Sequence, residues 1–147
     1  MRKNTLFVIL MGFLSASLHA QEPTDIIGYW LNEKADAKIE IYQKENIFEG
    51  KIVWMIHPKD ENGNWKLDSK NPNENLRNRK KIGLKILHNL KWDADQKEWN
   101  SGKIYNSREG DTYSLFAKIQ ESNTLNLRGF IGFSLFGKTT VWKRCKL

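Results

Sequence analysis

Eight short runs of alternating apolar and polar residues constrain the fold of this chain most strongly. The runs lie near 26–31, 38–43, 48–56, 83–90, 98–105, 112–120, 123–130 and 136–144. Alternation with period two is the pattern of a half-buried β-strand. Polar or glycine-containing turns separate most of the runs, and no long helical pattern is present. The sequence therefore predicts an antiparallel β-barrel or β-sandwich.

One long segment, residues 57–82, breaks this rhythm. Loops of this length in a compact domain are usually functional or carry some structure of their own. Pro72 directly follows Asn71, and a proline after an Asn cap is typical of a helix start. We therefore expect a long insert after the third strand, with a short helix in it. If the strands close into a barrel, such an insert would cover one mouth.

The first 20 residues have the pattern of a secretory signal peptide. Two basic residues precede the apolar run Leu6–Leu14, and small residues lead up to Ala20, after which we expect cleavage. The run is too short to span a bilayer. We therefore expect an exported protein, periplasmic or secreted, without a transmembrane segment. The remaining residues, 21–147, are expected to form one domain.

The net charge of the chain limits which classes of partner are expected. The whole chain has 24 Lys and Arg against 17 Asp and Glu, a net charge of +7. Arg2 and Lys3 are the only charged residues before Gln21, so the chain after the expected cleavage carries +5. A moderate positive charge favours solubility and weak attraction to anionic surfaces. Because the basic residues are spread along the strands of an exported protein, we expect no nucleic-acid partner.

Strict alternation, with charged residues taken as outward, predicts which side chains line the inside of the sheet. The large inward side chains that it predicts are Trp54, His88, Tyr113 and Trp142. The same alternation leaves apolar residues on the outer face, namely Val53, Met55, Leu87, Phe116 and Phe130. One β-bulge reverses every later residue of a strand, and Gly129 and Gly132 are natural positions for a bulge.

A series of short motifs then occurs in a fixed order. The motifs are Gly28-x-Trp30, Gly50-Lys51-Ile52-Val53-Trp54, Asp68-x-Lys70-Asn71-Pro72, Leu76-Arg77-x-Arg79-x-x-x-Gly83, Trp99-x-x-Gly102-x-Ile104-Tyr105, Gly110-x-x-Tyr113, Leu127-x-Gly129-x-x-Gly132, and Gly137 followed by Trp142-x-Arg144. Together they resemble the exported bacterial family called domain of unknown function 2147, over essentially the whole chain after residue 20. The resemblance implies an up-and-down β-barrel of about eight strands, of the lipocalin or fatty-acid-binding-protein type. It brings no established activity, substrate or cofactor.

The resemblance also implies a role for the two ends of the chain. In lipocalin-like barrels, a Gly-x-Trp on the first strand and a late Arg lying across that Trp lock the closed end. A cation over an indole ring contributes about 0.5–2 kcal/mol. We therefore interpret Gly28, Trp30 and Arg144 as a structural lock that ties the first strand to the last.

No motif predicts catalysis, a metal or a cofactor, and we expect none of them. Residues 132–139 match a phosphate-loop pattern, but a strand rather than a helix follows, and that context argues against nucleotide binding. His57 and His88 lack the spaced Cys or carboxylate partners of a metal site, and no catalytic triad or carboxylate pair can be assigned. The single Cys145 allows no internal disulfide, which leaves a spare thiol or an intermolecular bridge.

Arg77 and Arg79 belong to the basic cluster of the long segment, and two interpretations stay open. Charge runs in loops are usually solvated, and either Arg can simply tie the loop to the barrel. If the segment covers a mouth, Arg77 or Arg79 can instead bind a carboxylate or phosphate head group through paired hydrogen bonds.

The leading hypothesis is non-covalent binding of a small apolar or amphipathic molecule inside the barrel. Trp54, His88, Tyr113 and Trp142 would line the site, with Arg77 or Arg79 near its mouth. Bulky residues can also fill a small barrel completely. The first alternative is therefore a filled barrel whose outer apolar residues bind an envelope protein or an anionic surface. The second is a hydrolase acting on an envelope substrate, which would need a titrating His88.

Overall fold

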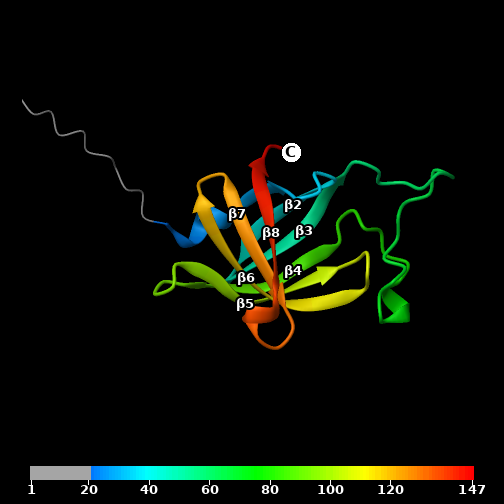
Figure 1. Cartoon of the computed structure of the whole chain (residues 1–147). Helices are drawn as coiled ribbons and strands as arrows, with labels where there is room; N and C mark the ends of the chain where they lie inside the picture. Colours follow the sequence, from blue (N-terminus) through cyan, green and yellow to red (C-terminus); the bar gives the residue numbers. More distant parts are fainter. Residues whose placement is uncertain (1–20) are drawn as a thin grey trace, which may run out of the picture.

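The computed structural model describes residues 21–147, and the predicted signal peptide lies outside the described residues. Eight antiparallel strands pair in chain order, and the last also pairs with the first, which closes a barrel (Figure 1). The strands are β1 (Gly28–Leu31), β2 (Ala37–Lys44), β3 (Ile47–Met55), β4 (Lys85–Asp93), β5 (Glu98–Asn106), β6 (Asp111–Glu121), β7 (Thr124–Phe130) and β8 (Lys138–Cys145). The predicted up-and-down barrel of about eight strands is thus confirmed.

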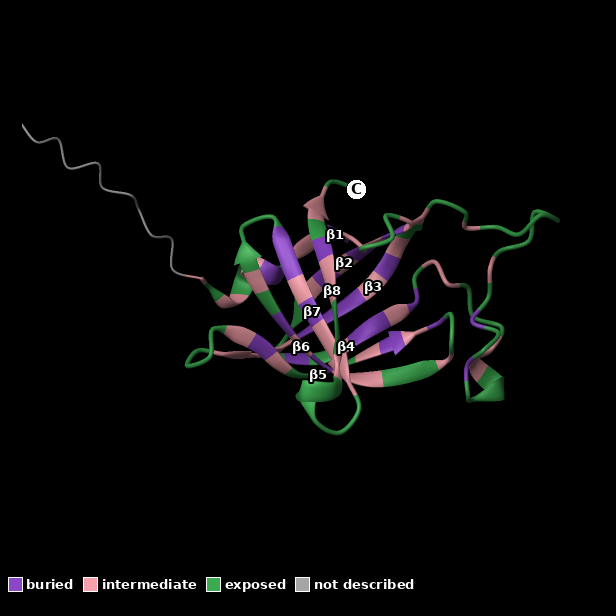
Figure 2. Cartoon of the chain, in the orientation of Figure 1, coloured by how far each residue is buried: buried purple, intermediate pink, exposed green. Residues whose placement is uncertain are grey.

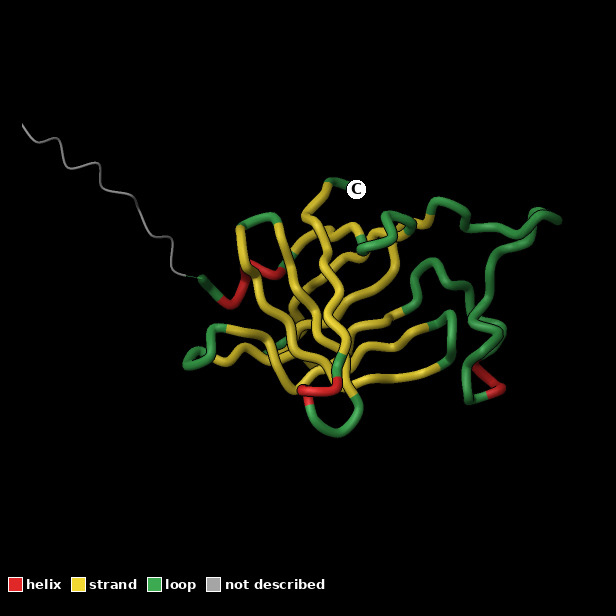
Figure 3. The backbone as a smooth tube through the Cα atoms, in the orientation of Figure 1, coloured by secondary structure: helices red, strands yellow, loops and turns green. Residues whose placement is uncertain are grey.

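Up-and-down topology sorts the connections onto the two ends of the barrel. Residues 32–36, 56–84, 107–110 and 131–137 join strands at one end, which we call the open end. The turns at 45–46, 94–97 and 122–123 lie at the other end, together with the short 3-10 helix η1 (Pro23–Ile26). Figure 3 shows η1 beside the β6–β7 turn, away from the long connection. We call this second end the closed end.

The core is densest at the closed end. Trp99 is fully buried, and its ring packs edge-on against Phe48 and at 4.7 Å from Trp92. Leu87 and Leu90, also fully buried, fill the space in front of Gly50 and Gly102. A Cβ added at either glycine would stand 2.8 Å or less from these leucines. Glycine is therefore required at both positions, because a leucine side chain of the neighbouring strand occupies the space that a Cβ would take.

The long connection, residues 56–84, leaves the barrel after β3 and returns before β4 (Figure 1). The expected helix at Pro72 is wrong, because among the described residues this segment carries only a 3-10 turn, η2 (Glu74–Leu76). The side chain of Asn73, not Asn71, accepts the capping hydrogen bond, from the N–H of Asn75. Most of the segment is exposed (Figure 2).

Candidate ligand-binding cavity

The open half of the barrel encloses a cavity of about 680 Å³. Its deep wall consists of buried apolar side chains, namely Ile39, Ile52, Ile86, Leu115, Leu127 and Trp142. Met55, Ile104 and Tyr113 line it and are only partly buried. The volume falls within the range of small-molecule sites, about 300–1,000 Å³. The barrel is therefore packed solid at its closed end and hollow at its open end.

Charged side chains surround the mouth of this cavity, with basic groups in excess. The basic residues are Lys34, Lys66, Lys81, Arg108 and Lys138, and the acidic residues are Glu33, Asp36 and Glu109. They come from all four connections or strand ends at the open end. An apolar interior below a cationic rim matches a molecule with an apolar body and an anionic head.

Two basic residues of the rim, Lys81 and Arg108, differ in the partner that each one binds. The Arg108 guanidinium pairs with Asp36 at 2.7 Å. Although burial opposes it, hydrogen bonds from Asn32 and Arg108 lower the pKa of Asp36. The Lys81 ammonium donates to the carbonyl oxygen of Ser107 at 3.0 Å, and burial lowers its pKa. Because Ser107 offers a dipole and not a charge, the positive charge of Lys81 remains available to a ligand.

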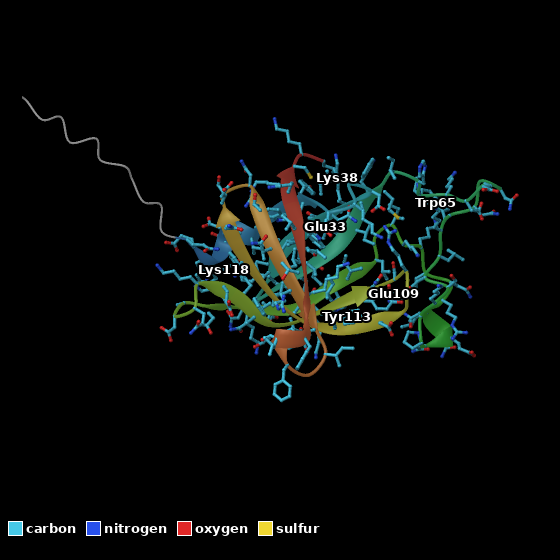
Figure 4. All side chains as sticks on the ribbon, viewed as in Figure 1. Glu33, Lys38, Trp65, Glu109, Tyr113 and Lys118 are labelled. Atoms are coloured by element: carbon cyan, nitrogen blue, oxygen red, sulfur yellow. The ribbon has the colours of Figure 1, made fainter. Side chains whose placement is uncertain are left out.

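Two of the predicted lining residues do line the cavity. Trp142 forms part of the buried deep wall. Tyr113 stands nearer the mouth, where its hydroxyl donates to a carboxylate oxygen of Glu109 at 3.3 Å. Figure 4 shows Glu109 and Tyr113 side by side near the long connection, and Lys118 of the same strand, β6, towards the opposite end.

Trp54 is outside the barrel, so its predicted inward orientation is wrong. The register between β2 and β3 shifts by one residue, since Lys38 pairs with Trp54 while the adjacent Ile39 pairs with Ile52. The bulge at Val53 turns Trp54 outward, where it is 36% exposed and lies under the ammonium of Lys38 at 5.2 Å. Met55 faces the cavity in its place and not the solvent, contrary to the expectation from alternation.

His88 is also on the outer face and does not line the cavity. Gly50 of β3 pairs with Leu87, whereas Lys51 pairs with Lys85, so that Ile86 is an extra residue in β4. This second bulge brings Leu87 inside, fully buried, and moves His88 opposite the exposed Lys103. Burial and the nearby Lys85 charge lower the pKa of His88.

Arg77 and Arg79 stabilise the long connection and neither contributes to the cavity lining. Arg79 pairs with Asp68 at 3.1 Å, and Arg77 donates to the carbonyl of Asn71 at 2.8 Å. Asp68 is fully buried and also accepts, at 2.6 Å, the hydroxyl of Tyr105 on β5. Burial, together with this hydrogen bond, raises the pKa of Tyr105 to about 12. The structural interpretation of both arginines fits this network.

At the closed end, Arg144 lies over the Trp30 ring, with 4.2 Å between the guanidinium carbon and the ring centroid. The contact expected between the first and last strands is therefore present. The Trp30 indole N–H donates to the carbonyl of Ile26 in η1 at 2.8 Å. A Cβ at Gly28 would stand 3.1 Å from the guanidinium, so a residue without a side chain lets Arg144 cross here.

Sequence alternation missed Lys66, Lys81, Arg108 and Met55 as residues of the site. The signal for the three basic residues was available in the topology. In an up-and-down barrel every second connection shares one end, so charges in those connections form a common rim. The inward orientation of Met55 results from the bulge at Val53, and no turn residue or glycine in the sequence indicates that bulge. Across residues 21–147, no group of three or more His, Cys, Asp or Glu side chains is arranged to hold a metal ion.

A closed eight-stranded antiparallel barrel, locked by a Trp–Arg contact at one end and hollow at the other, defines a lipocalin-like barrel. The chain belongs to the bacterial family described as "Uncharacterized protein conserved in bacteria (DUF2147)", whose model matches residues 28–144. Protein HP1028 from the human pathogen Helicobacter pylori, described as belonging to the lipocalin family, has a similar solved structure. Its TM-score is 0.68 at 26% sequence identity, over 82% of each chain. No curated protein matches the sequence.

Proposed function

We propose that this protein binds, without covalent chemistry, one small amphipathic molecule whose apolar body enters the barrel and whose anionic head stays at the mouth. One observation carries the proposal, namely the cavity of about 680 Å³ with an apolar deep wall and an excess of basic side chains at its rim. We further propose that the protein acts outside the cytoplasm, as the expected signal peptide implies, and that it has no catalytic activity.

The apolar wall supplies the affinity in this proposal. Burial of ligand hydrocarbon against Ile39, Leu127 and Trp142 is favourable by roughly 25 cal/mol per Å² before the costs of ordering. The closed end supplies the rigid floor, because it is already filled by its own side chains. A fatty-acid-like molecule suits this arrangement, since its chain would contact the apolar wall while its head group would stay at the basic rim.

The rim supplies the preference for an anion. Lys81 is half-buried and donates only to a carbonyl oxygen among its described hydrogen bonds. A carboxylate or phosphate that reaches it would gain a charge-assisted hydrogen bond, which is about twice as strong as a neutral one. The same group would approach Lys66, another partly buried residue of the rim.

The test is a fluorescence titration with cis-parinaric acid, a fluorescent fatty acid, on the chain that begins at Gln21. We expect saturable binding at one molecule per barrel. Ile104→Trp, which places an indole in the cavity across from the bare Gly129, should weaken binding at least about tenfold. Trp54→Ala is the matched control, since Trp54 is outside the barrel, and it should bind like the parent.

A second experiment tests the preference for an anionic head group. Lys81→Met should weaken the binding of oleate about tenfold, in line with the loss of one charge-assisted hydrogen bond, and should leave oleyl alcohol binding unchanged. Native mass spectrometry of the protein purified from its own envelope should show one extractable lipid-like mass. Absence of saturable binding, or equal effects of Ile104→Trp and Trp54→Ala, would contradict the proposal.

A further inference from the structure

The connection between β7 and β8, residues 131–137, displays its apolar side chains to solvent. These are Ile131 (74% exposed), Phe133 (78%), Leu135 (80%) and Phe136 (80%). We call this segment the β7–β8 loop. Large apolar groups this exposed and this close together are rare on monomeric proteins and mark an interaction surface.

Hydrogen bonds from Arg128 stabilise the exposed conformation of the loop. The Arg128 guanidinium donates to the carbonyl of Ser134 at 2.7 Å, to the carbonyl of Leu135 at 3.1 Å and to the hydroxyl of Thr139 at 2.9 Å. Residues Ser134–Phe136 form a 3-10 turn, η3. Because Arg128 binds the backbone behind the turn, the side chains of Leu135 and Phe136 are held outward and do not fold back onto the barrel.

The β7–β8 loop stands directly beside the mouth of the cavity. Gly129 and Lys138, which pair with each other at the two ends of the loop, both line that mouth. The β7–β8 loop, which includes η3, forms the exposed tip of the hairpin in Figure 2. Whatever covers this tip therefore also lies next to the entrance of the barrel.

We propose that the β7–β8 loop inserts into the interface of an anionic lipid bilayer and holds the open end of the barrel against it. The tip protrudes from the hairpin in Figure 2 and consists of the seven residues 131–137, which are too few alone for a stable protein interface of about 1,200–2,000 Å². A bilayer needs no matching groove, because each inserted apolar side chain contributes separately. Basic rim residues, of which Lys138 adjoins the tip, are complementary to anionic head groups.

The docking proposal rests on the loop and does not require that the cavity bind a ligand. If both hold, the bilayer is the source or destination of the ligand, because docking places the cationic mouth at the depth of lipid head groups. An amphipathic molecule could then pass between membrane and barrel without crossing water. Failure of vesicle binding would overturn docking and leave the titration with cis-parinaric acid unaffected, so the two failures are distinguishable.

The test is flotation with vesicles of phosphatidylethanolamine and phosphatidylglycerol, using the chain from Gln21, which contains every strand of the barrel. We expect the parent protein to float with the vesicles. Phe133→Ser combined with Phe136→Ser should reduce the bound fraction at least about tenfold, since each Phe loses its inserted apolar surface. Ile27→Ser combined with Leu147→Ser removes two exposed apolar side chains outside the open-end connections, and we expect it to float like the parent.

A local probe makes the insertion itself visible. In a Cys145→Ser background, an environment-sensitive fluorophore on Leu135→Cys should shift to the blue on adding vesicles. The same fluorophore on Gln96→Cys, in the β4–β5 turn at the closed end, should not shift. The proposal is overturned if the parent fails to float, if the loop variant floats equally well, or if sedimentation shows that the loop instead joins two copies of the chain.

Discussion

At the scale of single residues, Arg144 connects several segments at the closed end. Its guanidinium covers the Trp30 ring and donates to the carbonyls of Asp25, Ile27 and Ser122. These carbonyls belong to η1, to the residue before β1, and to the β6–β7 turn. One planar cation therefore satisfies three chain segments that would otherwise leave their carbonyls unpaired at the closed end.

We predict that Arg144→Met lowers the free energy of unfolding by about 2–4 kcal/mol, as the sum of the lost cation–π contact and lost charged hydrogen bonds. Arg144→Lys should recover less than half of this loss, because an ammonium has neither the planar face nor the fork of donors. Urea unfolding monitored by tryptophan fluorescence measures both variants. Full recovery by Lys would show that charge alone matters here.

At the scale of elements, the outer faces of β3 and β4 are joined by an ion pair between a buried carboxylate, Glu49, and a partly exposed ammonium, Lys85. The Glu49 carboxylate is 2.8 Å from the Lys85 ammonium and accepts the hydroxyl of Tyr42 at 3.1 Å. The hydrogen bond from Lys85 lowers the pKa of Glu49 against the opposing effect of burial. The stability that this carboxylate contributes is fully present above its unfolded pKa and is lost as the pH falls through the folded value.

We therefore predict that Glu49→Gln makes stability less sensitive to acid below about pH 4.5, the usual range for Glu. The measurement is urea unfolding at pH 7 and at pH 3.5, comparing the loss for each variant with that of the parent. Glu40→Gln is the matched control, because Glu40 pairs with Lys51 in a more exposed position and should keep the parent's loss. An identical acid-induced loss in Glu49→Gln and the parent would contradict the assignment.

A second prediction at this scale concerns the long connection between β3 and β4. Asp68 holds Tyr105, Asn71 and Arg79 in one buried network. Tyr105→Phe should lower the free energy of unfolding by about 1–3 kcal/mol, because it removes a donor to a buried carboxylate. It should also speed hydrogen exchange in residues 66–81, while exchange in β7 and β8 stays as in the parent. Equal changes in both regions would place the effect in the whole barrel.

Element order was predictable from this sequence, and side-chain orientation was predictable only in part. Alternation located all eight strands because every run has an apolar face and turn residues separate most of the runs. It placed Tyr113 and Trp142 correctly on the inward face. Trp54 and His88 were misplaced by bulges at Val53 and Ile86. A bulge is set by pairing with the neighbouring strand, and neither Val nor Ile has a local preference that reveals one.

At the scale of the whole molecule, the barrel separates stability from binding. The closed end concentrates Trp30, Trp99 and Arg144 around η1. The open end has the cavity, the basic rim and the exposed β7–β8 loop. The two ends share strands and one continuous apolar core, but Trp30, Trp99 and Arg144 do not line the cavity. Changes that are well separated and share no partners usually have additive effects on free energy.

This separation gives a prediction that joins the two ends. Oleate at about 100 times its dissociation constant should stabilise the parent by about 2.7 kcal/mol, which raises the melting temperature by several degrees. Arg144→Met should melt lower than the parent yet gain the same increment from oleate, since the floor of the cavity is intact. Ile104→Trp, whose affinity is at least about tenfold lower, should gain no more than about half of this increment at the same oleate concentration. Differential scanning fluorimetry measures all three, and a lost increment in Arg144→Met would show that the closed end and the cavity are energetically coupled.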